Sequence, residues 1–142
     1  MRALLDVNVL IALLDALHVH HERARRWLRD NIRHGWATCP ITQNGCLRIM
    51  AQPGYPNSLP TQAVAQRLAE ATGTGHHQFW PDDTSILDST VVDWRRIIGP
   101  KQITDIYLLA LATARQGRFV TFDAGIALDA VIGARDANLD VI

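Results

Sequence analysis

The chain begins with a short apolar segment that ends on a carboxylate. The run from Ala3 to Leu5 is typical of a buried strand, and Asp6 follows it at once. Residues 7–14 are then apolar with helical spacing. An acid at the carboxyl end of a buried strand lies where open α/β sheets bind their ligands. Because a desolvated carboxylate is costly unless it is paired, hydrogen-bonded or bound to a metal, we expect Asp6 either to cap the next helix or to serve a functional site.

Strand and helix patterns alternate along the rest of the chain, and this order predicts the fold class. Apolar runs typical of strands cover residues 2–6, 36–39, 77–80, 118–123 and 139–142. Helix signals cover residues 7–14, 20–32, 43–52, 58–73, 85–89, 103–115 and 124–128, and residues 91–98 are a candidate continuation of the fifth. Thr42 is the expected N-cap of the third helix. The alternation predicts an α/β fold whose mostly parallel sheet carries helices on both faces.

Composition limits the size and the setting of the protein. The 142 residues are 48% hydrophobic, which suits one domain over residues 1–142. Lys and Arg (14) balance Asp and Glu (14), so the overall charge indicates neither a nucleic-acid nor a membrane partner. Cys39 and Cys46 lie in apolar surroundings and predict buried free thiols, which fits a cytosolic location. We expect no signal peptide and no membrane span, because no apolar run approaches ~18 residues.

Three aspartates fall where the expected topology would gather them. Asp6 and Asp123 each end an apolar strand, and Asp105 opens the helix at residues 103–115. Because the carboxyl ends of parallel strands share one edge of the sheet, we expect the three carboxylates to converge. Clustered carboxylates repel one another unless a cation binds, and oxygen ligands without histidine or thiolate suit Mg²⁺ or Mn²⁺. Such an ion assists phosphodiester hydrolysis, which is therefore the predicted reaction class.

Each acid also has a purely structural interpretation. Asp6 and Asp123 could cap helices, and Asp105 could do no more than complement a helix dipole. The agreement of the three positions favours a metal site over these roles. Asn8 lies near the same edge, where it either orients a ligand or water or caps the first helix. Thr121, in the strand that leads to Asp123, is a further auxiliary site residue.

Other polar side chains are weaker candidates. Arg48 either contacts the phosphate backbone of RNA, pairs with a site carboxylate, or remains in solvent. The arginines within residues 20–33 form either a solvated helix face or an electropositive surface for RNA or for an acidic partner. His18 and Glu22 are four residues apart and could bind a transition metal from one helix face, although such stretches usually lie in solvent.

Four segments match, in order and spacing, a known family of toxins. They are LLDVNVLIAL at residues 4–13, ATCPITQNGCLRIM at 37–50, QITDIYLLALA at 102–112 and GRFVTFDAGI at 117–126. Together they resemble the PIN domain of VapC-type toxins. FWPDD at residues 79–83 is similar to a segment of one bacterial subgroup of those toxins. The resemblance covers essentially the whole chain.

The resemblance implies a three-layer α/β sandwich and a Mg²⁺- or Mn²⁺-dependent endoribonuclease, the toxin of a type II toxin–antitoxin system. It also implies a homodimer that is located in the cytoplasm of a prokaryote, and a cognate VapB-like antitoxin that blocks the site. Under this resemblance Arg48 is a contact to RNA or to the antitoxin. The metal-site acids of the family carry over onto Asp6, Asp105 and Asp123. A fourth acid, a Glu in many members, is here Gln43. An amide accepts a hydrogen bond from water but brings no negative charge, so a second metal ion is less expected than a first.

Two other functions compete with the nuclease. A haloacid-dehalogenase-like phosphatase also begins with a strand and an aspartate, but it needs a second acid where this chain has Asn8 and a Thr where it has Leu10. The alternative from another class is a catalytically weak PIN-fold module that mainly binds an antitoxin peptide or RNA, and Gln43 is its only support. Measurements of metal binding and RNA cleavage separate this module from the nuclease.

Overall fold

The protein is built around one five-stranded sheet. The computed structural model describes residues 1–142, and the strand order is β3-β2-β1-β4-β5. Every pair of neighbouring strands is parallel, as the alternating pattern predicts. The strands are β1 (Ala3–Leu5), β2 (Trp36–Thr38), β3 (His77–Phe79), β4 (Arg118–Thr121) and β5 (Leu139–Val141). Their carboxyl ends therefore lie along one edge of the sheet.

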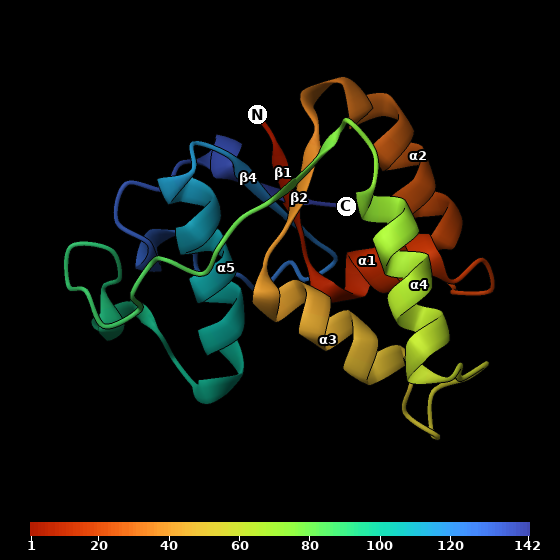
Figure 1. Ribbon diagram of the computed structural model, residues 1–142. Helices are drawn as coiled ribbons and strands as arrows, with labels where there is room; N and C mark the ends of the chain where they lie inside the picture. Colours follow the sequence, from red (N-terminus) through yellow and green to blue (C-terminus); the bar gives the residue numbers. More distant parts are fainter.

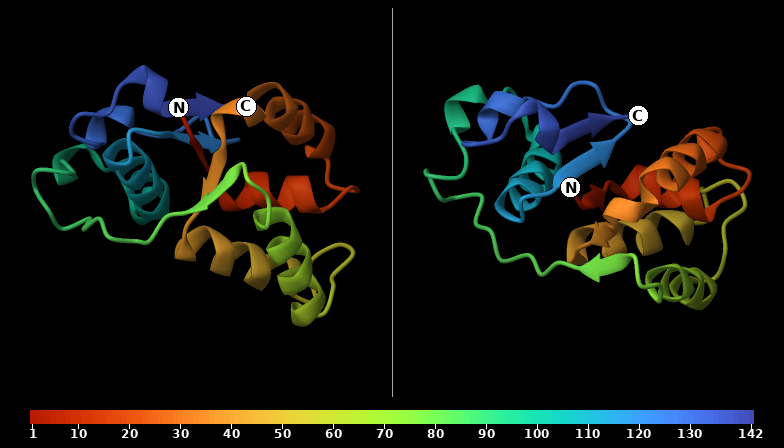
Figure 2. Two further views of the ribbon diagram at one scale, coloured as in Figure 1. Left: turned by 45° about the horizontal axis from the view of Figure 1, so that its top comes forward. Right: turned by 90° about the horizontal axis from the view of Figure 1, so that it is seen from above.

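Five α-helices cover the two faces of this sheet. They are α1 (Val7–Leu14), α2 (His21–Asn31), α3 (Pro40–Met50), α4 (Thr61–Thr72) and α5 (Ile103–Ala114). Helix α5 lies on one face, and α1 to α4 gather on the opposite side (Figures 1 and 2). The expected three-layer α/β sandwich is therefore confirmed. None of the helices has the length and apolar character needed to cross a bilayer.

Successive side chains of the central strands pack alternately into two separate hydrophobic cores, one on each face of the sheet. Leu4 of β1 and Phe119 of β4 pack on the α5 side, and both are fully buried. Their neighbours Leu5 and Val120 are equally buried on the other side, with residues of α1 and α3. The alternation follows from the two-residue repeat of a strand, and each large buried side chain contributes about 1.5–3 kcal/mol. The two cysteines are buried free thiols in these cores, as predicted.

The expected helix at residues 85–89 and its continuation through residues 91–98 are wrong. This segment consists of turns, and its only helical element is a 3-10 turn at Trp94–Arg96. The side chains of Ser85 and Asp88 each accept a hydrogen bond from the backbone N–H two residues later. Such local bonds satisfy the backbone without a helix, which explains the difference.

Two other element boundaries also differ from expectation. Residues 124–128 form no α-helix, and a 3-10 turn at Leu128–Ala130 follows instead. Helix α3 begins at Pro40 with Cys39 in the N-cap position, so Thr42 is not the cap. Proline suits the first helical position because its missing N–H is not needed there. The Thr42 hydroxyl instead accepts the Cys39 N–H at 2.9 Å from inside the first turn.

Gly117 lies where β4 begins, in a space that admits no side chain. A Cβ there would stand 2.7 Å from the Arg2 carbonyl oxygen and 2.7 Å from the Trp80 ring. The Arg2 carbonyl accepts the Arg118 N–H, and Trp80 is buried, so neither moves away easily. We expect Gly117→Ala to lower the free energy of unfolding in urea by about 1–3 kcal/mol. Gly54→Ala, whose Cβ would meet nothing within 4 Å, is the control, and equal stability of both variants would contradict this close packing.

Candidate active site

Asp6 occupies the end of β1 and performs two structural tasks there. Its Oδ1 accepts the Val7 N–H at 2.7 Å, which caps α1, and its Oδ2 accepts the Thr121 hydroxyl at 2.8 Å. Its own N–H donates to the Val120 carbonyl at 2.9 Å. The residue is only 8% exposed. The cap role and the site role therefore do not exclude each other, because these bonds hold the carboxylate at the sheet edge.

Thr121 joins Asp6 to Asp123. Its buried hydroxyl donates to Asp6 and accepts the Asp123 N–H at 3.1 Å. The Asp123 carboxylate accepts the Gly125 N–H at 2.7 Å through one oxygen, and the residue itself is exposed. One threonine thus positions the two acids that follow neighbouring strands.

Asp105 completes the group from the first turn of α5. The residue is half-buried, and burial together with the negative charges of Asp6 and Asp123 raises the pKa of Asp105 to about 6. The pKa of Asp6 is raised as well, by burial first and then by the charge of Asp123, against the hydrogen bonds from Thr121 and Val7. The negative charges of neighbouring acids thus contribute to the raised pKa of both Asp6 and Asp105, which places the three acids predicted from sequence near one another.

No cationic side chain relieves this repulsion. None of the ion pairs of the protein includes Asp6, Asp105 or Asp123. Carboxylates that are mutually repelled and unpaired favour a bound cation, and an all-oxygen donor set favours a hard one such as Mg²⁺ or Mn²⁺. The residues fit such an ion by charge and donor chemistry. The three carboxylates do not by themselves complete a coordination sphere, because no three His, Cys, Asp or Glu side chains lie close enough together to hold a metal directly.

An open cleft of about 400 Å³ lies beside Asp6. Asn8 and Arg48, both singled out from the sequence, are exposed and line it together with Asp6. Arg48 makes no ion pair with a carboxylate of this protein, so its guanidinium is available to an incoming anion. The cleft also includes Asn44 and Thr104, which the sequence interpretation did not assign to the site. The sequence offered a signal for each, because Asn44 lies one helical turn before Arg48 and Thr104 lies directly before Asp105.

Gln43 does not line the cleft that contains Asp6. Its side-chain N–H donates to the Thr38 hydroxyl at 3.0 Å, and that hydroxyl also bonds the His77 ring at 2.8 Å. Gln43 lines a separate hollow between α3 and α4, with Leu47 among its neighbours. The amide thus has protein partners of its own in the position where many family members carry a fourth acid.

The histidine cluster before α2 forms no metal site with Glu22. Glu22 lies 3.8 Å from Arg25 and 4.0 Å from His21, and His18 accepts the His20 backbone N–H at 3.1 Å. Because Glu22 faces Arg25 and one ring nitrogen of His18 already accepts a backbone N–H, nothing in the structure supports the prediction of a transition-metal pair at His18 and Glu22.

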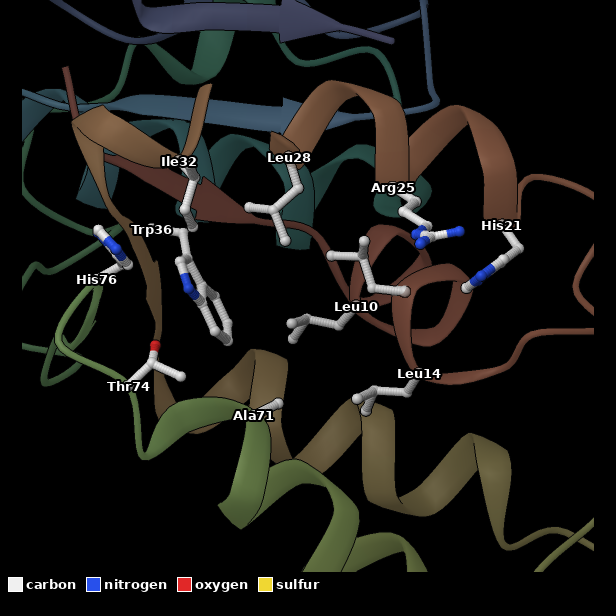
Figure 3. A pocket seen from close by; sticks show the side chains of 11 residues that line it. Leu10, Leu14, His21, Arg25, Leu28, Ile32, Trp36, Ala71, Thr74 and His76 are labelled. Atoms are coloured by element: carbon white, nitrogen blue, oxygen red, sulfur yellow. The ribbon is translucent and has the colours of Figure 1, made fainter. Parts of the chain in front are cut away.

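A second hollow of the protein is apolar and lies apart from the acids. Figure 3 shows this pocket of about 380 Å³ between α1, α2, α4 and β2, with leucine side chains and Trp36 in its wall. Its lining contains no carboxylate. His21, at one end, has its Nδ1 2.7 Å from the Ala12 carbonyl oxygen and is thereby held in place. The pocket therefore offers mainly apolar surface and no acids that could bind a cation.

The parallel α/β sandwich, with acids at the carboxyl edge of its sheet, matches a known family. The family described as the PIN domain matches residues 3–131. The chain therefore belongs to the PIN-domain family, and within it to the VapC ribonucleases. It is 58% identical to Ribonuclease VapC44 of Mycobacterium tuberculosis over 98% of both chains. It is 43% identical to Ribonuclease VapC39 of the same organism over 94% of this chain and 96% of that one.

Two solved structures share the fold at low sequence identity. One is Mycobacterium tuberculosis VapC20, described as a sarcin–ricin loop cleaving toxin, with a TM-score of 0.59 and 12% identity over 94% of this chain and 98% of that one. The other is VapBC2 from Rickettsia felis bound to a DNA fragment from its promoter, with a TM-score of 0.63 and 12% identity over 100% of this chain and 98% of that one. These likenesses confirm the fold.

Proposed function

We propose that this protein is a Mg²⁺- or Mn²⁺-dependent endoribonuclease and the toxin of a type II toxin–antitoxin system. The observation that carries the proposal is the group of Asp6, Asp105 and Asp123 at one sheet edge, without a cationic side chain to neutralise it. A bound divalent cation would polarise the phosphodiester and lower the pKa of water. The ribonuclease names of the relatives support the same reaction class.

Each of the other roles in the reaction is assigned to a side chain of this protein. The three carboxylates would hold the cation directly or through water molecules, and Thr121 positions Asp6 through the hydrogen bond to its Oδ2. Arg48 binds a phosphate oxygen of the substrate, since a guanidinium matches phosphate with paired hydrogen bonds. Asn8 orients the substrate or a water molecule from the same cleft wall.

The proposed partners follow from what the neighbours are described to do. VapC20 is described as a sarcin–ricin loop cleaving toxin, and the name VapBC2 joins a VapB to a VapC. We therefore propose an RNA substrate and a cognate VapB-like antitoxin for this chain. We further propose that it acts as a homodimer in the prokaryotic cytoplasm, with residues 1–142 as one PIN-like domain.

Cleavage of RNA by the purified protein tests this function. We expect defined RNA fragments in the presence of Mn²⁺ or Mg²⁺ and none after the ions are removed with EDTA. Fragments that persist in EDTA would contradict the metal-dependent reaction. Calorimetric binding of the ions without cleavage of cellular RNA would instead favour the binding module for which Gln43 is the only sequence support.

Arg48 should affect substrate binding more than turnover. We expect Arg48→Gln to raise KM for an RNA oligonucleotide about tenfold, because a charged hydrogen bond to phosphate contributes about 1.5–3 kcal/mol, with a smaller change in kcat. Steady-state cleavage of a fluorescent substrate measures both constants. Arg33→Gln is the control, since Arg33 is an exposed arginine at the opposite edge of the sheet, before β2. A KM that changes equally in both variants would remove Arg48 from the site.

A further inference from the structure

A stack of three tilted aromatic rings begins next to Asp123, just after the end of β4. Phe122 directly precedes Asp123, and its partly buried ring lies 4.7 Å from the His20 ring, centre to centre, at an interplanar angle of 37°. The centre of the His18 ring lies 5.7 Å from that of the His20 ring, at an interplanar angle of 48°. Consecutive Cα atoms are about 3.8 Å apart, so this stack begins one residue from a proposed metal ligand.

Two unpaired arginines of α2 extend from this stack. Arg23 is exposed, and its Cζ lies 5.7 Å from the centre of the Phe122 ring. Arg26 follows three residues later, so it lies on the same helix face, and both line a surface hollow of about 370 Å³ between α2 and β5. Neither forms an ion pair with a carboxylate of the protein.

Asp30 and Asp140 line the same hollow, and one oxygen of each carboxylate is bonded to a group other than these arginines. Asp140 accepts hydrogen bonds from Trp27 at 2.9 Å and from Arg118 at 3.2 Å. Asp30 is paired with Arg29 at 3.2 Å. The arginines on the rest of α2 behave differently, since Arg25 lies 3.8 Å from Glu22. The guanidinium groups of Arg23 and Arg26 are therefore the unpaired positive charges on the face of α2 that borders Phe122.

From this arrangement we propose that His18, His20, Arg23, Arg26 and Phe122 form an RNA subsite, here termed the stacking rim. One unpaired base of the substrate stacks on His20 and Phe122, and the two arginines hold the phosphates that follow. The inference rests on the proposed function, because Phe122 of the rim directly precedes Asp123, a proposed metal ligand. Aromatic rings beside free guanidinium groups are the combination that binds single-stranded RNA without requiring base pairs.

Binding of RNA without cleavage tests the rim separately from catalysis. The probe is a fluorescent single-stranded RNA oligonucleotide, and its anisotropy is measured with the full chain in EDTA, in an Asp6→Asn background. We expect His20→Ala to weaken binding roughly five- to 100-fold, the range for loss of one stacked base. Arg23→Gln should weaken binding about fivefold and lower the slope of log affinity against log salt by roughly 0.7.

Matched variants separate the rim from effects on folding. Phe122→Leu should weaken binding, whereas Phe122→Tyr, which keeps a ring, should bind as tightly as the parent protein. Arg25→Gln, on the other face of α2, should stay within about twofold. Wild-type affinity in both His20→Ala and Arg23→Gln would overturn the rim, whether or not the chain cleaves RNA. Loss of antitoxin binding in these variants with RNA binding intact would also overturn it, by making the surface a protein interface.

Discussion

Replacement of Asp6 by Asn should lower RNA cleavage by about 100-fold or more, while the protein remains folded. The variant removes one negative charge from the proposed cation site, and the loss of one preorganised electrostatic contact costs about this much in turnover. The side chain keeps its size, so its oxygen can still accept the Val7 N–H that caps α1. Cleavage of an RNA oligonucleotide at saturating Mn²⁺ measures the effect, and circular dichroism verifies the fold.

The control for this variant is Asp136→Asn. Asp136 is an exposed acid of the turn before β5, at the opposite end of the sheet from the site, and it forms no ion pair. We expect it to cleave RNA at the wild-type rate. If Asp6→Asn retained comparable activity in a preparation free of contaminating nuclease, Asp6 would be only a helix cap.

Mg²⁺ or Mn²⁺ should stabilise the protein strongly near pH 7.5 and weakly near pH 5. An ion present at 100 times its dissociation constant adds about 2.7 kcal/mol, which raises the unfolding temperature by roughly 10 °C. Burial and the charges of Asp6 and Asp123 raise the pKa of Asp105 to about 6. Below that pH the proton competes with the cation for the carboxylate, so the shift in unfolding temperature should decline. Differential scanning fluorimetry across this pH range measures it.

The ion-free protein should show the opposite dependence on pH. Because the pKa of Asp105 is higher in the folded state than its ordinary value of 3.8, the folded protein binds more protons between about pH 4 and pH 6. The contribution of this group to stability therefore falls as the pH rises through that window and stays lower above it. Since Asp105 is only half-buried, solvent screening reduces the effect to about 1 kcal/mol.

Asp105→Asn isolates this contribution. In EDTA near pH 7.5, the variant should be more stable than the wild type by about 1 kcal/mol, and this advantage should disappear near pH 4. The same variant should lose most of the stabilisation by Mg²⁺, whereas Asp136→Asn should keep it. A difference between wild type and Asp105→Asn that is the same at both pH values would contradict the clustering of the acids.

The parallel sheet and the positions of the three acids were predicted from local patterns of the sequence. A parallel sheet follows from alternating strand and helix periodicities, and the parallel arrangement brings the ends of β1 and β4 to one edge. An acid directly after such a strand is then placed by its sequence position alone, as Asp6 and Asp123 are. The errors at residues 85–89 and 124–128 arose where side-chain oxygens compete with helix formation, because capping residues favour turns as readily as helices.

The direction of side chains on packed helices was decided by the tertiary structure. Gln43 and Arg48 lie on the same helix, yet Gln43 donates a hydrogen bond to Thr38, whereas Arg48 lines the cleft with Asp6. The direction of each side chain depends on how α3 packs against its neighbours. The stack of His20 on Phe122 joins residues far apart in the chain. By itself the sequence determined the fold class and the positions of the three acids in the fold, because both follow from short-range periodicity. The surroundings of those acids depend on distant segments meeting, which only the packing of helices against the sheet establishes.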